Sequence, residues 1–146
     1  MITRPMLFSA PMVRALLDGT KTQTRRVVKV EALECLSTPV GFSPQFVAEK
    51  KNRLCPYGQT GDQLLVRSSR ITLEITGVRL ERLQDISEAD AIAEGVEWFS
   101  SGAVECPGMP DNPLDAFSQL WEQINEHGSW AANPWVWVIE FKRLTS

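Results

Sequence analysis

The first regular pattern along the chain is a short amphipathic segment that begins after Ser9. Apolar residues recur at the spacing of one helix face, at Met12, Ala15 and Leu16. Gly19 follows, and glycine readily adopts the left-handed conformation that ends many helices. The pattern predicts a helix that begins after Ser9 and ends at Gly19.

Four segments carry the β-branched or aromatic patterns that are typical of strands, namely 21–28, 63–67, 71–80 and 135–141. Residues 68–70 leave room only for a tight hairpin between the second and third segments. Side chains alternate between the two faces of a strand, so in the first segment Thr24 and Arg26 share one face and Gln23 and Arg25 the other. Gly77 interrupts the third segment.

Two further helices are predicted in the second half of the chain. Ser87 followed by Asp90 has the form of a helix cap, and Gly95 is placed to end that helix. Its inward-facing residues are expected to be Ala89, Ile92 and Ala93. The second helix begins at Asn112 and Pro113, with apolar residues at helical spacing at Leu114, Phe117, Leu120, Trp121 and Ile124. The intervening segments 31–60 and 100–111 are rich in proline and glycine and are expected to be loops.

The order of these elements indicates the fold class. One helix, one strand, a long loop, two strands, two helices and a last strand predict a small α+β domain around a curved sheet or barrel. The length of 146 residues favours one domain over residues 1–146. No apolar stretch is long enough to cross a bilayer and no secretion signal opens the chain, so we expect a cytoplasmic monomer without a membrane partner.

Cysteine usage argues against both disulfides and metal. Cys35, Cys55 and Cys106 are three in number and widely spaced, which is typical of reduced thiols. Together with His127 they lack the close pairs of a zinc site, so we expect no metal and no other cofactor. His127 is expected at the surface, and Trp121, Trp130, Trp135 and Trp137 form either the core or a base-stacking platform.

Charge is divided unevenly along the chain, although the net charge is only −3. Residues 1–30 contain six basic residues against Asp18, whereas residues 81–126 contain eleven carboxylates against Arg82. A basic segment can bind phosphate or another anion, or it can pair with the acidic half of its own fold. Composition alone leaves both alternatives open.

The densest polar cluster is Gly19-Thr20-Lys21-Thr22-Gln23-Thr24-Arg25-Arg26. Its spacing Gly-x-Lys-x-x-Thr-x-Arg, followed by Gly61-Asp62-Gln63 and the closing Val136-Trp137-Val138-Ile139-Glu140-Phe141, resembles the signature of the ASCH domain. That domain is a small β-barrel with flanking helices, related to the RNA-binding PUA fold. The likeness spans nearly the whole chain and extends to a branch that is common in phages and prophages, whose members carry a longer insertion where this chain has only residues 68–70.

The resemblance implies an activity and a set of residues. Bacterial N(4)-acetylcytidine amidohydrolases of this superfamily remove an acyl group from a nucleoside amine, and their lysine and threonine fall on Lys21 and Thr24. Their glutamate falls best on Glu94, although Glu74, Glu88, Asp90 and Glu97 are also nearby. Arg26, Glu74 and Tyr57 are the expected substrate-binding residues, and Arg25 is expected to face solvent or to form a salt bridge. Tyr57 either stacks on the base or anchors its loop.

Amide hydrolysis explains why these residue types belong together. Thr24 can be the nucleophile if a desolvated Lys21 is its base, and Glu94 then orients Lys21 or activates water. Alternatively Glu94 activates water directly, with Lys21 at the oxyanion. Residues three apart on a flat strand point to opposite faces, so Lys21 must belong to the turn after Gly19.

Two other functions use the same residues. One is a PUA-like RNA-binding module, and the other is an ASCH-type ribonuclease. The acidic bulk of the chain argues against tight binding of long RNA, which requires a broad basic surface, but it permits a nucleoside in a pocket.

Overall fold

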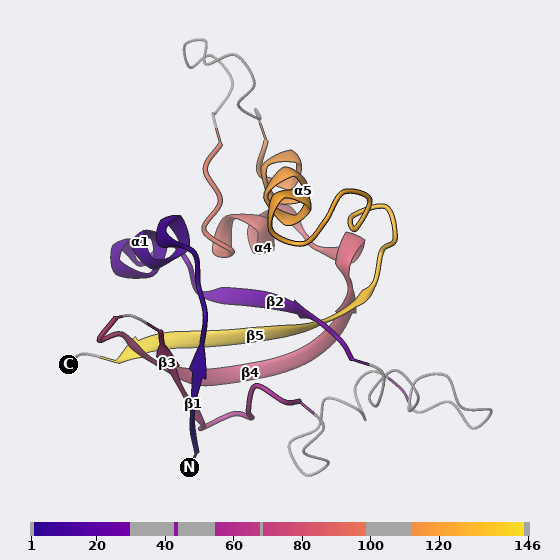
Figure 1. Cartoon of the computed structure of the whole chain (residues 1–146). Helices are drawn as coiled ribbons and strands as arrows, with labels where there is room; N and C mark the ends of the chain where they lie inside the picture. The colour runs from indigo at the N-terminus through magenta and orange to yellow at the C-terminus, as the bar shows by residue number, and fades with distance from the viewer. Residues whose placement is uncertain (1, 30–42, 44–54, 68, 99–111, 145–146) are drawn as a thin grey trace.

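The structure is a computed structural model that describes residues 2–29, 43, 55–67, 69–98 and 112–144. Five strands form one sheet in the order β1-β3-β4-β5-β2. They are β1 (Thr3–Met6), β2 (Gln23–Val27), β3 (Gln63–Val66), β4 (Thr72–Arg82) and β5 (Trp135–Leu144). Three helices, α1 (Ala10–Asp18), α4 (Glu88–Ala93) and α5 (Pro113–Ile124), lie on one side of the sheet, and a short 3₁₀ helix, η2 (Leu83–Asp85), follows β4 (Figure 1). The predicted α+β class is confirmed.

The sheet is mixed and strongly curved. β1 pairs with β3 in parallel, whereas the other neighbouring strands are antiparallel. The long strands β4 and β5 bend across the molecule, with a register shift at Gly77 where the sequence predicts an interruption (Figure 1). β1 and β2 are the two edges of the sheet, and within the described residues no pairing between them closes it into a barrel.

β1 is an element that the sequence pattern does not predict. Pro5 lies inside it, and proline cannot donate a backbone hydrogen bond to a sheet. The strand forms nevertheless because it lies at the edge, where only one side needs a partner. Its consequence for the site is that the next residues, Leu7 and Phe8, turn from the sheet toward α1.

Helix α1 follows the prediction closely. Met12, Ala15 and Leu16 are its buried residues. Gly19 adopts the left-handed conformation with φ of 80°, and its backbone N–H donates to the carbonyl groups that end the helix. The chain therefore reverses sharply before β2, and Lys21 lies in this turn, outside the strand, as expected.

Helix α4 differs from the prediction in the face that it buries. Ser87 caps the helix as expected, accepting a hydrogen bond from the backbone N–H of Asp90. However, Ala89 and Ile92 are exposed, and the inward positions are Ala91 and Glu94. The prediction of inward Ala89 and Ile92 is wrong, and Ala93 is half-buried. The short helix instead packs Ala91 into the apolar cluster beside α5 and turns the Glu94 carboxylate at its C-terminal end toward Lys21 and Arg25.

The core consists of two clusters. The larger lies between α1 and the sheet, and the smaller joins η2, α4, α5 and the N-terminal half of β5. Trp121 and Trp137 are buried, while Trp130 and Trp135 are partly buried and pack against these clusters. The tryptophans are therefore core residues, and they do not form an exposed platform.

The remaining expectations concern single residues and loops. His127 is exposed, as predicted. Cys55 is a buried free thiol, and burial raises its pKa. Cys35, Cys106, the linker 100–111 and most of the loop 31–60 lie outside the described residues. None of the helices in the described ranges combines the length and hydrophobicity needed to span a bilayer.

Candidate functional site

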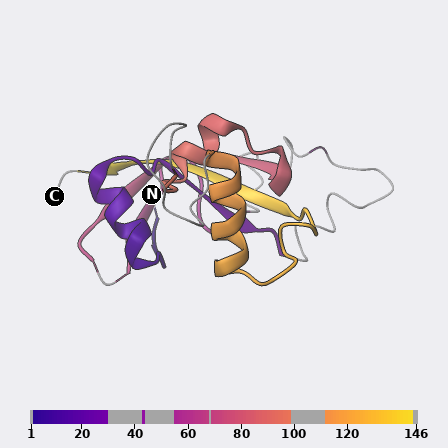
Figure 2. The ribbon, with the colours of Figure 1, turned by 90° about the horizontal axis from the view of Figure 1, so that it is seen from above.

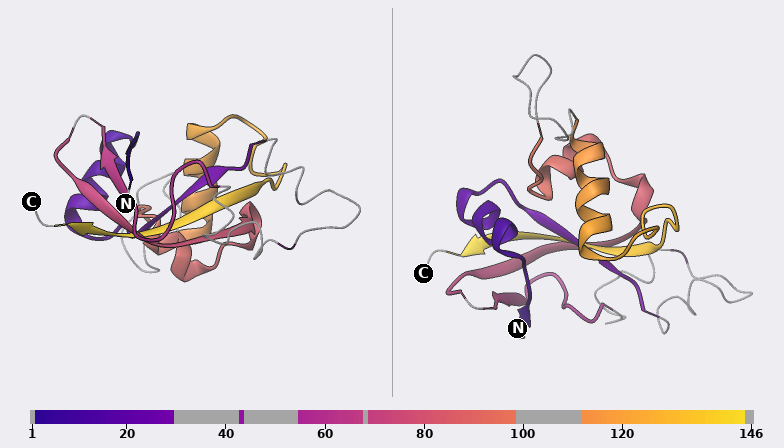
Figure 3. Two further views of the ribbon diagram at one scale, coloured as in Figure 1. Left: turned by 90° about the horizontal axis from the view of Figure 1, so that it is seen from below. Right: turned by 45° about the horizontal axis from the view of Figure 1, so that its top comes forward.

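A pocket of about 880 Å³ lies where the chain after β1, the strand β2 and the helix α5 come together. Figures 2 and 3 show α1 and α5 on the same side of the sheet, with β2 passing below them. One wall is apolar and is formed by Phe8, Met12, Phe117, Leu120, Trp121 and Ile124. The polar lining comes mainly from β2 and its flanks, and includes Lys21, Thr24, Arg25, Arg26, Lys29, Tyr57 and Glu94.

Lys21 is held rigidly at the base of this pocket. Its ammonium nitrogen Nζ donates to the backbone carbonyls of Gln23 and Glu94, at 2.9 Å each, and lies 3.8 Å from Glu94 Oε1. The side chain is 3% exposed, and this burial lowers the pKa of Lys21, although the charge of Glu94 opposes the shift. Burial thus favours the neutral amine of Lys21, the form that accepts a proton, whereas its contacts with Glu94 and the two carbonyls favour the charged form.

Glu94 is the carboxylate beside Lys21. It follows the last turn of α4, where Gly95 with φ of 88° lets the chain pass close to Ala15 and Lys21. Burial raises the pKa of Glu94, and the charges of Lys21 and Arg25 oppose that shift. A buried carboxylate shared between two cations is well oriented, because it cannot rotate without losing one of them.

Thr24 lies on β2 opposite Ile139 of β5 and is buried at the pocket wall. Within the described residues its hydroxyl forms no hydrogen bond, although the neighbouring polar side chains on β2 do. A hydroxyl at a pocket wall without a protein partner is available to a ligand.

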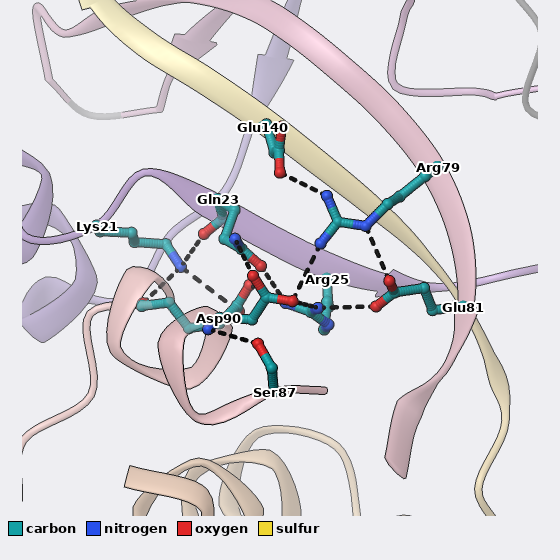
Figure 4. A network of polar contacts seen from close by, with 9 residues as sticks. Lys21, Gln23, Arg25, Arg79, Glu81, Ser87, Asp90 and Glu140 are labelled. Atoms are coloured by element: carbon teal, nitrogen blue, oxygen red, sulfur yellow. Dashed lines mark hydrogen bonds and ion pairs between the residues drawn. The ribbon is translucent and has the colours of Figure 1, made fainter. Parts of the chain in front are cut away.

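Arg25 connects the site to a network of charges on the other face of β2 (Figure 4). Its side chain is fully buried and bonds to Glu94 at 3.1 Å, Glu81 at 3.0 Å and Asp90 at 3.3 Å. Arg79 extends the network, since it bonds to Glu81 and Asp90 and to Glu140 of β5. Arg25 therefore forms salt bridges, one of the two alternatives predicted, and it does not face solvent.

Asp90 lies between the two arginines of this network, as Figure 4 shows. Burial opposes its ionisation, but the hydrogen bond from Gln23 and the charges of Arg25 and Arg79 outweigh that effect and lower the pKa of Asp90. The acidic segment thus supplies the partners of Arg25 through side chains on β4 and α4.

Arg26 lies on the pocket side of β2. It donates to the backbone carbonyl of Leu7 at 3.0 Å, and its guanidinium carbon lies 5.1 Å from the centre of the Phe8 ring. Burial lowers the pKa of Arg26, with the nearby Tyr57 opposing the shift. Tyr57 is partly buried, lines the same pocket and packs against the core, so it remains suited to both roles considered from the sequence.

Glu74 is the one expected site residue that the fold places elsewhere. It lies on β4, where its carboxylate pairs with Lys142 of β5 at 3.0 Å, and it is not among the residues that line the pocket. Of the candidate glutamates, Glu94 is the one that lines it. No group of three or more histidine, cysteine or acidic side chains in the described ranges is arranged to hold a metal ion.

Comparison with known proteins identifies the fold. No protein-family sequence model matches the chain, and no curated protein sequence does. Among solved structures, an ASCH domain from Lactobacillus crispatus superposes with a TM-score of 0.58 at 16% identity, covering 97% of this chain and 79% of that one. This chain has the ASCH-domain fold.

Two further solved structures match this chain over their whole length. The hypothetical protein PH0355 matches with a TM-score of 0.54 at 12% identity, covering 98% of this chain and 100% of its own. A protein from Pyrococcus furiosus matches with a TM-score of 0.50 at 10% identity, covering 99% of this chain and 100% of its own. At such low identity the fold is retained although most side chains differ.

Two features of the site in this ASCH fold were not anticipated from the sequence. One is that Arg25 forms ion pairs with several carboxylates. These include Glu81 of β4 and Asp90 of α4, which lie 56 and 65 residues away in the sequence. The other is the apolar wall from α5, which sequence analysis treats as core. The sequence signals for these two features are the adjacent arginines on β2 and the apolar Ile124 at the end of the helix pattern.

Proposed function

We propose that this protein is an amidohydrolase that removes the acyl group from N(4)-acetylcytidine or a related N(4)-acylated cytosine nucleoside. One observation carries the proposal. Lys21, Thr24 and Glu94, which come from a turn, a strand and a helix end, line one pocket, and Lys21 bonds to Glu94 directly. These are the three residues that the resemblance to acetylcytidine amidohydrolases assigns.

The polar contacts of these residues fit the chemistry of amide hydrolysis. In one route the Thr24 hydroxyl attacks the acyl carbon, its proton passes to Lys21, the C–N bond breaks as the amine takes that proton, and water hydrolyses the acyl ester. In the other route Glu94 takes the proton from water, which attacks directly, while Lys21 stabilises the oxyanion. Both routes release acetate and cytidine. The first requires Lys21 in its neutral form, and the second requires a charged Lys21 beside an ionised Glu94.

The apolar wall of the pocket supports a substrate with a flat ring. Phe8, Phe117 and Trp121 line the cavity together with the polar residues of β2. Pockets that bind small molecules combine an apolar lining with a few convergent polar groups. A cytosine base with an acyl group on its amine has this character.

The decisive experiment is incubation of the purified protein with N(4)-acetylcytidine, followed by chromatography of the products. We expect cytidine to form, and Lys21→Ala and Thr24→Ala each to lower the rate by at least about 100-fold, the scale of an acid–base or nucleophilic contribution. Arg14→Ala is the matched control, because Arg14 is an exposed residue on α1 outside the pocket. Circular dichroism of each variant distinguishes loss of activity from loss of folding.

A comparison of two glutamates tests the third assignment. Glu94→Gln is expected to lower the rate by at least about tenfold, because it removes the charge beside Lys21. Glu74→Gln changes a carboxylate that pairs with Lys142 outside the pocket. Equal losses in the two variants would contradict the assignment of Glu94. The proposal is overturned if the wild-type protein releases no cytidine and instead binds or cleaves a short single-stranded RNA in a salt-sensitive manner. Such a result would favour an RNA-binding module or a ribonuclease.

A further inference from the structure

The cations of the pocket divide into two pairs with different environments. Its lining includes four cations but one carboxylate, Glu94. Lys21 and Arg25 both bond to that carboxylate. Arg26 and Lys29 also line the pocket, and neither forms an ion pair with a described residue. The pocket therefore retains positive charge although the chain as a whole is acidic.

Arg26 is positioned to present its remaining donors to a ligand. Its hydrogen bond to the carbonyl of Leu7 and its contact with the Phe8 ring fix the guanidinium group in one orientation. One bond to a carbonyl uses only one of five N–H donors, so the others remain available. A guanidinium that is fixed and partly desolvated binds phosphate oxygens with better geometry than a free surface arginine does.

Lys29 lies three residues further along, just beyond the end of β2. Because a strand rises about 3.3 Å per residue, its Cα lies within about 10 Å of that of Arg26, whereas Thr24 is about 7 Å from Arg26 in the other direction. Lys29 is exposed and yet lines the pocket, so it lies at the rim. The order Thr24, Arg26, Lys29 therefore leads from the interior of the pocket to its opening.

We infer that the pocket binds a phosphorylated substrate, a mononucleotide, with Arg26 and Lys29 as the subsite for its phosphate. The inference rests on the proposed function for the interior end of the pocket, where the acylated base lies against Lys21 and Thr24. The phosphate then extends along β2 toward the rim, where it meets two cations that have no carboxylate partner among the described residues. A neutral nucleoside would leave this positive charge unused.

The charge distribution favours a mononucleotide over a nucleic acid chain. Binding of RNA requires basic residues along a continuous surface, each neutralising one phosphate. Here the net charge is −3, so the chain as a whole has no excess of basic residues to neutralise phosphates beyond the first. A single phosphate needs only Arg26 and Lys29.

Kinetics with two substrates test the inference. We expect kcat/KM for N(4)-acetylcytidine 5′-monophosphate to exceed that for N(4)-acetylcytidine by about tenfold at low salt, and the preference to decrease as salt screens the charges. Lys29→Ala should lower kcat/KM for the nucleotide about fivefold more than for the nucleoside. Arg14→Ala, which removes an exposed charge outside the pocket, should change neither value.

Equal kcat/KM for the two substrates in the wild type would overturn the inference, as would a Lys29→Ala variant with the same preference as the wild type. Calorimetric binding of cytidine 5′-monophosphate and of cytidine keeps this result separate from the proposed function, because it needs no hydrolysis. Tighter binding of the monophosphate, weakened by Lys29→Ala, supports the subsite even if no acyl group is released. Tighter binding of a short cytidine oligonucleotide than of the monophosphate would assign the subsite to RNA and overturn the mononucleotide.

Discussion

Replacement of Arg25 by methionine tests how much the fold depends on the charge network beside the site. Methionine fills much of the same space without a charge, so the substitution removes the electrostatic contacts and leaves most of the packing. Glu81 and Asp90 keep Arg79 as a partner and are partly exposed. Glu94, whose side chain is 6% exposed, keeps only Lys21, at 3.8 Å, among its ion-pair partners in the described residues. The loss of stability should therefore come mainly from Glu94.

The magnitude follows from the cost of an uncompensated buried charge. Removal of one partner of a buried ion pair typically costs about 3–5 kcal/mol. Total stabilities of small domains are about 5–15 kcal/mol, so Arg25→Met would remove a large part of the free energy of unfolding. At about 2–4 °C per kcal/mol for a chain of this size, Tm should fall on the order of 10 °C.

Urea unfolding of Arg25→Met, followed by circular dichroism, measures this loss against Arg14→Met, an exposed control on α1 that should lie within about 0.5 kcal/mol of the wild type. The same substitution in a Glu94→Gln background should cost about 1–3 kcal/mol less, because the stranded charge is then absent. A cost for Arg25→Met no larger than that of the control, or an equal cost in both backgrounds, would refute the reasoning.

Three further predictions concern the glycine turns beside the site, the cap of α4 and the titration of Asp90. Gly95→Ala should lower the free energy of unfolding by about 2–4 kcal/mol, because φ is 88° and the added Cβ would lie 2.9 Å from that of Ala15. Gly19→Ala, with φ of 80° and open space around the position, should cost only about 1 kcal/mol. Urea unfolding measures both, and equal losses would contradict the expectation. Ser87→Ala removes the hydrogen bond that caps α4 and should lower the free energy of unfolding in urea by about 1 kcal/mol. An unchanged free energy of unfolding would contradict a stabilising role for this cap. The pKa of Asp90 is lowered in the folded state, so its stabilising contribution is present above the unfolded pKa of about 3.9 and is lost as the pH falls through the folded pKa. Asp90→Asn should therefore lose less stability than the wild type on acidification below about pH 4. Parallel profiles of Tm against pH for the two proteins would contradict that expectation.

Local patterns were sufficient for most elements of the fold. The helix boundaries at Gly19, Ser87 and Asn112 follow from residues whose side chains or backbone freedom act within one turn, so sequence reveals them. β1 was missed because its pairing with β3 joins residues about 60 positions apart and its own pattern is interrupted by Pro5. The inward face of α4 cannot be predicted locally, because it depends on the contact of Ala91 with the apolar cluster and of Glu94 with Lys21 and Arg25.

The sequence by itself determined an α+β fold, the turn that holds Lys21 outside β2, and the chemical types of the residues around it, since these depend on neighbours along the chain. Only the tertiary structure decided which charges meet. It brought Glu94 to Lys21, turned Arg25 to the acidic side of β2 and left Arg26 and Lys29 lining the pocket without an acidic partner among the described residues. The physical reason is that ion pairing depends on distance in space, and the partners come from strands and helices that are distant in sequence.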